Sequence, residues 1–203
     1  MNLLHIDTAI TGGNSVSQQI SAAIVASVRI ANPAINITRR DLDAEPIPHL
    51  DSRSIAKLGG GANPQADDAE AIRNAALVEE FLAADIVVIG APMYNFTISS
   101  QLKAWIDRVA VAGKTFRYTE SGAQGLAGGK KVFIASTRGG IYSEGPAAAA
   151  DFQEPLLRQV FAFMGIDDVT FVRAEGVAYG PDHRKAALDA AVADAASMFA
   201  LAA

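Results

Sequence analysis

Apolar residues in this chain gather into short runs, separated by longer stretches with the spacing of amphipathic helices. The strongest run, Ile86 to Ile89 with Gly90, lies in the stretch Asp85–Phe96. Because no polar residue interrupts it, it predicts a strand buried on both faces, at the centre of a parallel sheet. Four further strands are predicted at Asn2–Asp7, Ile35–Leu42, Lys130–Ser136 and Val169–Ala174.

Helical spacing of apolar residues follows each predicted strand. The predicted helices cover Ser17–Ala31, Asp67–Phe81, Ser99–Gly113, Ala148–Met164 and Pro181–Leu201. Alternating strands and helices with right-handed crossovers predict an α/β fold, with a five-stranded parallel sheet in the order 2-1-3-4-5 and helices on both faces. At 203 residues, we expect a single domain over residues 1–203. Asp43–Asn63 and Lys114–Gly129 lack this periodicity and predict surface excursions.

In that strand order, the loops after Asp7, Gly90 and Ser136 converge on one crevice. The first loop delivers Ser15 and Ser17 to a helix N-terminus, where backbone N–H groups, the helix dipole and hydroxyl donors favour a phosphate. The simpler interpretation is that the two serines only cap the helix. This first loop contains no Gly-Lys-Ser/Thr and no G-x-G-x-x-G, which favours a monophosphate over a nucleotide triphosphate or dinucleotide.

The second loop presents Met93, Tyr94, Asn95 and Phe96, a set suited to a flat ring with polar edges. Alternatively, these residues are ordinary core aromatics and a gap-filling methionine. The third loop, Thr137-Arg138-Gly139-Gly140, lets backbone N–H groups approach such a ring closely, although two glycines also fit a plain tight turn.

Composition narrows the function classes. The net charge of −5, with scattered Lys and Arg, argues against nucleic-acid or anionic-membrane partners. No apolar run reaches the roughly 20 residues of a membrane span, and no cysteine is present, so we expect a soluble, cytoplasmic protein that binds small molecules. His5, His49 and His183 are too dispersed for a metal site, and none is expected.

Six segments together carry a family resemblance, and they run in order from the first strand to the last helix. They are DTAITGGNSVSQ, APMYNF, SSQLKAW, GKTFRYTESGAQGLAGGKK, STRGGIYSEGP and AEGVAYGP. The set resembles the FMN-dependent NADH-azoreductase family, flavodoxin-like enzymes that also reduce quinones. MYNF and KTFRYT are its most discriminating parts.

The resemblance implies a set of FMN contacts. They fall on Ala9, Ser15, Val16, Ser17, Met93, Tyr94, Asn95, Phe96, Thr137, Arg138, Gly139 and Gly140. Where the family commonly has two serines after the first strand, this chain has Thr8 and Ala9, so one hydroxyl donor to the phosphate is lost. Such a bond is worth about 0.5–1.5 kcal/mol, and more to a charged group, so we expect FMN binding to be weakened but retained.

The resemblance further implies a ping-pong reaction in which NADH or NADPH reduces FMN and a quinone or azo compound then accepts the electrons. No acid or base from the protein is needed, and Asn95 is expected to orient and tune the flavin. Phe116 and Tyr118 are expected to wall the substrate pocket, in a homodimer whose partner completes each site. For Trp105, a partner contact and core packing are equally compatible with the sequence.

Three other functions remain open from the sequence. One is a quinone reductase whose azo activity is incidental. The second is a flavodoxin-type electron carrier that passes single electrons to protein partners. The third is a flavin-free interaction module, which the alanine at position 9 keeps open.

Overall fold

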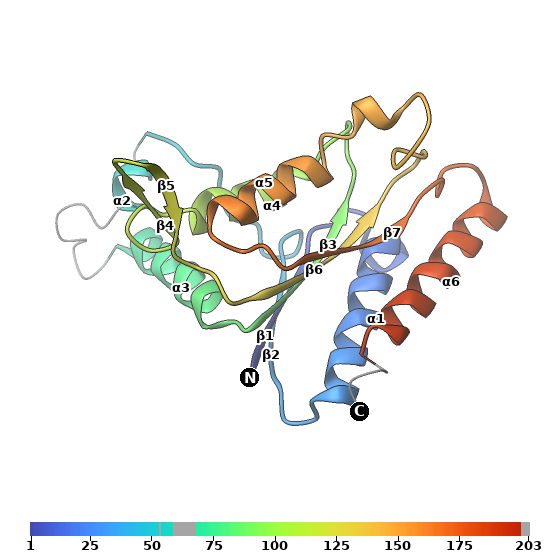
Figure 1. The fold of residues 1–203 in the computed structure, drawn as a ribbon, viewed down its shortest axis with the longest axis horizontal. Helices are drawn as coiled ribbons and strands as arrows, with labels where there is room; N and C mark the ends of the chain where they lie inside the picture. The colour runs from blue at the N-terminus through green and yellow to red at the C-terminus, as the bar shows by residue number, and fades with distance from the viewer. Residues whose placement is uncertain (53, 59–67, 200–203) are drawn as a thin grey trace.

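The computed structural model describes residues 1–52, 54–58 and 68–199. Its main sheet has five parallel strands in the order β2-β1-β3-β6-β7. Counted among themselves, these strands follow the predicted order 2-1-3-4-5, and Figure 1 shows them as one twisted sheet. The strands are β1 (Asn2–Asp7), β2 (Asn36–Asp41), β3 (Ile86–Pro92), β6 (Lys131–Thr137) and β7 (Val169–Ala174).

The strand β3 is the centre of the sheet, and all seven of its residues are buried. Its side chains alternate between two hydrophobic clusters, with Val88 in one and Ile89 in the other. The register pairs Asp7 with Gly90 and Pro92 with Thr137. The carboxyl ends of β1, β3 and β6 therefore meet at one edge of the sheet.

Helices cover both sides of the sheet in Figure 1, with α1 and α6 on one side and α3, α4 and α5 on the other. Their bounds are α1 (Val16–Ala31), α3 (Ala69–Ala83), α4 (Ser100–Val109), α5 (Glu154–Phe163) and α6 (Pro181–Ser197). Ser15, Asp68 and Ser99 cap α1, α3 and α4 by accepting hydrogen bonds from backbone N–H groups in the first turn. Among the described residues, no helix has both the length and the apolar character needed to cross a bilayer.

Core packing accounts for Trp105 within this chain. The indole is fully buried and meets the Phe81 ring edge-on, with 5.5 Å between ring centroids. On the next turn of α4, buried Arg108 donates hydrogen bonds to the carbonyls of Pro48 and His49 and so holds part of the predicted Asp43–Asn63 excursion against the helix. That stretch includes a short helix, α2 (Ile55–Leu58), while residues 53 and 59–63 lie outside the described part.

The helix predicted from Ala148 begins later, so that prediction was wrong at its start. The alanine run forms only a short 3₁₀ turn, η2 (Ala148–Ala150). The Asp151 carboxylate then accepts hydrogen bonds from the backbone N–H groups of Gln153 and Glu154. Because this side chain satisfies the first backbone donors and Pro155 favours a first turn, α5 starts at Glu154.

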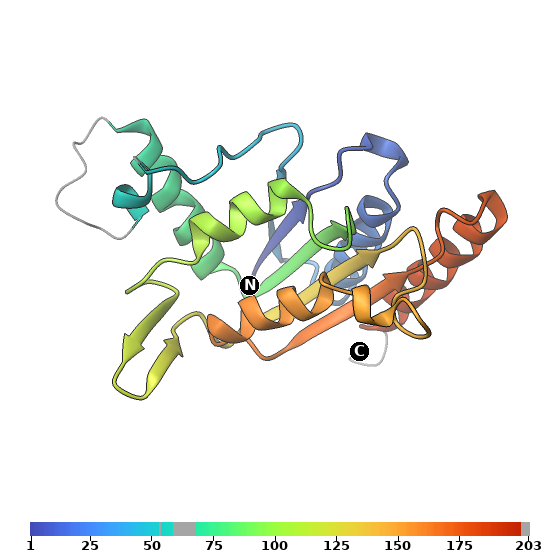
Figure 2. The same cartoon turned by 90° about the horizontal axis from the view of Figure 1, so that it is seen from above.

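The predicted Lys114–Gly129 excursion contains an antiparallel hairpin, β4 (Phe116–Thr119) and β5 (Gly122–Gly125). The Phe116 ring packs on Phe163, with 4.4 Å between centroids. Gly125 lies so close to Gly165 that a Cβ at position 125 would sit 2.0 Å from the Gly165 nitrogen. The hairpin joins the end of α4 to the start of β6, and Figure 2 shows it at the opposite end of the sheet from the arrowheads of the strands.

Candidate active site

The three loops that follow β1, β3 and β6 line one cavity of about 300 Å³. Six of the residues singled out in the sequence lie in it, namely Ser15, Val16, Met93, Tyr94, Thr137 and Gly139. Two hydrogen bonds, both donated by backbone N–H groups, hold the loops together. Met93 N donates to the Thr137 carbonyl at 2.7 Å, and Ile10 N donates to the Tyr94 hydroxyl at 3.2 Å. The sequence-based expectation that these loops converge is confirmed.

The start of α1 offers unused donors to this cavity. The Ser15 hydroxyl accepts from Gln18 N and lies 2.9 Å from the Ser17 hydroxyl. The backbone N–H groups of Val16 and Ser17 donate to no acceptor within the part of the chain that the structure describes. Ser15 therefore does cap the helix, and two N–H groups at its positive end remain available for an anion.

The first loop is held in place by a hydrogen bond to β3. The Thr8 hydroxyl donates to the Gly90 carbonyl at 2.8 Å, so it is already engaged, and Ala9 is buried beside it. A Cβ at Gly90 would lie 3.1 Å from the Asp7 carboxylate. Glycine at this position thus allows β3 to approach the buried end of β1.

The Asp7 carboxylate anchors the end of β1. It accepts hydrogen bonds from Ser21 and Arg39, and His5 Nε2 lies 3.3 Å away. Burial alone raises the pKa of Asp7, but His5, Arg39 and Ser21 together outweigh it and hold the pKa below its ordinary value. The Asp7 carboxylate is consequently a charged structural anchor next to the loop of residues 8–15, which we call the phosphate loop.

The MYNF loop contains a turn that few residue types adopt. Tyr94 and Thr97 exchange backbone hydrogen bonds of 2.9 and 3.1 Å, while Asn95 has φ +49° and Phe96 φ +71°. This is the pattern of a type I′ turn, in which asparagine is favoured and a bulky aromatic is rare. Both side chains are exposed at the rim, and Asn95 lines an adjoining hollow of about 730 Å³ with Met93 and Tyr94.

The side chain of Arg138, which we expected to contact FMN, points into the protein and pairs with carboxylates. Its guanidinium is fully buried and lies within 3.1 Å of the Asp151, Glu154 and Glu175 carboxylates. Its backbone N–H donates to the Ala174 carbonyl, and its carbonyl accepts from Val177. Because every strong polar group of Arg138 is engaged with the protein, it positions the loop and leaves the contact with a ligand to its neighbours.

Gly139 and Gly140 keep their donors free. Their carbonyls accept from Ala178 N and Gly176 N, which ties this loop to the one after β7. Their own N–H groups donate to no acceptor among the described residues. Two backbone donors therefore remain on this wall, and Gly139 lines the same cavity as Ser15 and Val16.

Sequence reasoning missed two residues that support this wall. Buried Gln153 donates to the Ala91 carbonyl at 2.8 Å and accepts from Ser136 and Arg138, so it joins the ends of β3 and β6. Burial raises the pKa of Glu175, but hydrogen bonds from Ser143, Tyr142 N and Arg138 bring it below its ordinary value. Neither role has a sequence signal, because both residues follow loops whose path cannot be read from spacing.

Phe116 and Tyr118 do not join the other site residues within one chain. Both lie on the hairpin at the far end of the sheet, where Phe116 is buried and Tyr118 is 74% exposed. Within one chain they therefore do not line the crevice, and their place in a substrate pocket stays a prediction.

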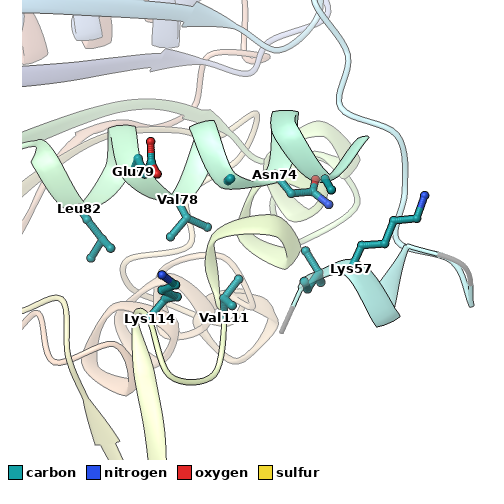
Figure 3. A pocket seen from close by; sticks show the side chains of 10 residues that line it. Lys57, Asn74, Val78, Glu79, Leu82, Val111 and Lys114 are labelled. Carbon is teal, nitrogen blue, oxygen red and sulfur yellow. The ribbon is translucent and has the colours of Figure 1, made fainter. Parts of the chain in front are cut away.

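Figure 3 shows a separate, smaller hollow of about 170 Å³, between α3 and the loop after α4. It is lined mainly by apolar side chains such as Val78, Leu82 and Val111, with Lys57 and Lys114 beside them. It contains none of the residues predicted from the sequence as site residues.

Comparison with known proteins agrees with this geometry. A family model described as "Flavodoxin-like fold" matches residues 1–199. The FMN-dependent NADH:quinone oxidoreductase of Stenotrophomonas maltophilia (strain K279a) is 58% identical over 193 residues, covering 95% of this chain and 93% of the relative.

The chain belongs to the flavodoxin-like FMN-dependent NADH:quinone oxidoreductase family.

Solved structures that are similar to this chain share its fold. An azoreductase from Bacillus anthracis str. Sterne has 31% identity and a TM-score of 0.88, with 98% of each chain covered. An FMN-dependent NADH-azoreductase from Bacillus anthracis str. Ames Ancestor, in complex with FMN, has 25% identity and a TM-score of 0.87, with 100% of each chain covered. The family resemblance read from the sequence is confirmed.

Proposed function

We propose that this protein binds FMN and transfers two electrons from NADH to quinones by a ping-pong reaction, and that it also cleaves azo bonds reductively. The observation that carries the proposal is one cavity lined on two sides by unused backbone donors, at Val16 and at Gly139, with the free donors of Ser17 and Gly140 next to them in the chain. Relatives named for FMN-dependent NADH:quinone oxidoreduction, and neighbours named azoreductase, support the choice of chemistry.

FMN matches the donors that the cavity presents. Val16 N–H and Ser17 N–H, at the positive end of α1, would hold the phosphate together with the Ser15 and Ser17 hydroxyls. When bound, FMN supplies the chemistry by accepting and returning a hydride.

The chain's own residues then orient and tune the ring. Gly139 and Gly140 would offer N–H groups to the ring edge that becomes negative on reduction, and the Asn95 amide would do so from the opposite wall. Met93 and Tyr94 would shape the slot. NADH and a flat aromatic acceptor would occupy the same open face in turn, which is the basis of the ping-pong order.

We further propose a homodimer in which the β4–β5 hairpin of one protomer reaches the open face of its partner's site. The loops around the crevice carry large apolar side chains that are 41–60% exposed, namely Ile10, Phe96, Ile141, Phe152 and Tyr179. Tyr118 protrudes from the hairpin with most of its ring exposed. A symmetric pair of contacts would cover both surfaces and would place Phe116 and Tyr118 beside a substrate.

An anaerobic bleaching experiment tests the activity. Purified protein reconstituted with FMN should lose its yellow colour with NADH and regain it when a quinone is added, and an azo dye should be decolourised by the reduced enzyme. A flavodoxin-type carrier would bind FMN yet fail to bleach with NADH. Protein that stays colourless in excess FMN would overturn the proposal altogether.

Complementation tests the dimer. Inactive Asn95 and Tyr118 variants, unfolded and refolded together, would form mixed dimers in which one site carries both changes and the other carries neither. Random pairing should restore roughly a quarter of the sites to full activity. No recovery from mixed dimers that are verified by mass would show that Tyr118 acts only within its own chain.

A further inference from the structure

Arg184 stands out among the residues that line the cavity because it alone carries a formal charge there. It lies in the first turn of α6, whereas the phosphate loop lies 170 residues earlier in the chain. Its Nη2 donates a hydrogen bond to the carbonyl of Asn14, the residue immediately before the Ser15 cap of α1. The helix α6 thus places a cation next to the end of the phosphate loop.

The Arg184 guanidinium has no carboxylate partner within the part of the chain that the structure describes. Most other buried or half-buried cations of the described residues meet carboxylates, as Arg40, Lys57, Arg108 and Arg138 do. The ion pairs of the described residues do not include Arg184, and its one side-chain hydrogen bond is to the neutral Asn14 carbonyl.

The position is also electrostatically unfavourable for folding. The first turn of a helix carries the positive end of its dipole, where a cation is unfavourable. The same loop faces the positive end of α1, whose Val16 and Ser17 N–H groups are unused. The Arg184 cation and the positive end of α1 therefore both face this cavity, and an anion would match them.

We propose that Arg184 binds the phosphate of the cofactor and replaces the hydroxyl contact that Ala9 cannot make. This inference rests on the proposed function, because it takes FMN as the ligand. A guanidinium donates to phosphate through geometrically matched N–H groups, and only one of its nitrogens is engaged by Asn14. Arg184 would therefore offset part of the phosphate affinity that the alanine in the first loop removes.

The competing explanation is that Arg184 only fastens α6 to the loop through the Asn14 carbonyl. In that case its loss would loosen the site for any ligand. Riboflavin separates the two explanations, since it carries the same ring as FMN and lacks the phosphate. A fastening role would change the affinities for both ligands alike.

The test measures dissociation constants of apoprotein for FMN and for riboflavin by quenching of flavin fluorescence. Arg184→Gln should weaken FMN binding about tenfold or more while leaving riboflavin binding within about twofold. Arg184→Lys should recover most of the loss. Lys185→Gln is the matched control, because it removes the same charge from the next position, where the side chain is 75% exposed and pairs with Asp189.

Each outcome bears on a different claim. If Arg184→Gln weakens FMN and riboflavin equally, or weakens neither, the assignment to the phosphate is overturned while FMN binding stands. If Lys185→Gln has as large an effect on FMN, the contribution is general charge and the assignment also fails. If the unchanged protein binds neither flavin, the proposed function and this inference fall together.

Discussion

Replacing Arg138 with methionine should destabilise the protein strongly, because the side chain holds three carboxylates in a nearly dry setting. The guanidinium lies 3.0 Å from Asp151, 2.6 Å from Glu154 and 3.1 Å from Glu175, and its Nε donates to Gln153. Removing one partner of a buried ion pair costs about 3–5 kcal/mol, since the remaining charge stays buried. For a domain of this size, we expect Tm to fall by roughly 6–20 °C.

The loss should depend on pH in a defined direction. The pKa of Glu175 lies below its ordinary value in the folded protein, so this carboxylate contributes stability above the unfolded carboxyl pKa of about 4.3 and loses it as the pH falls. Without Arg138 that contribution shrinks. The gap in unfolding free energy between the two proteins should therefore be largest above about pH 5 and should narrow towards pH 3.

Urea denaturation of the apoprotein across this pH range measures the effect. Arg173→Met is the matched control, because it removes a cation from the same Glu154 carboxylate, but from a side chain that is 44% exposed. Its cost should stay near 1 kcal/mol or less. A loss below about 1 kcal/mol for Arg138→Met, or a gap that does not change with pH, would refute the view of Arg138 as an electrostatic anchor.

Three further outcomes can be checked. Asn95→Gly should keep the turn with φ > 0 and bind FMN, yet slow the reduction of the flavin by NADH, measured by anaerobic stopped flow. Asn95→Ala should in addition destabilise the protein by about 1 kcal/mol in urea denaturation, because alanine is strained at φ > 0. Unchanged reduction rates in both variants would contradict the tuning role. Ala9→Ser should tighten FMN binding roughly tenfold by fluorescence titration without altering riboflavin binding, and an equal gain for both ligands would contradict a phosphate contact. Gln153→Leu should cost about 2–4 kcal/mol, because it strands the Ala91 carbonyl and the Ser136 hydroxyl; calorimetry showing a neutral change would contradict this.

The order of the parallel strands was predictable because hydrophobic runs and alternating helices leave few topologies. The same rule brought the three loops together, since carboxyl ends of neighbouring parallel strands share an edge. The β4–β5 hairpin was not predictable, because its strands have only four residues each, β5 is glycine-rich, and its packing depends on Gly125 meeting Gly165. An apolar pattern reports burial against the core, and this hairpin buries little besides Phe116.

Within the site, the residue types in the sequence indicated that a ligand binds there, but they did not indicate what each side chain does. Arg138 was expected at the ring, but its guanidinium pairs with three carboxylates, which lie just before α5, in its first turn and in the loop after β7. Arg184 gave no signal, since one arginine on an alanine-rich helix is ordinary until the fold places it beside Asn14. Long-range polar contacts of this kind are set by tertiary structure alone.

The paired positive φ angles at Asn95 and Phe96 also bear on how the site can evolve or be engineered. At position 95, the backbone accepts asparagine, aspartate or glycine far more readily than other residues, whatever chemistry the slot requires. Redesign of the acceptor preference through this position is thus confined to three side chains. Variation in substrate range is easier to obtain from Ile10, Ile141 or Tyr179, whose exposed side chains surround the slot with ordinary backbone angles.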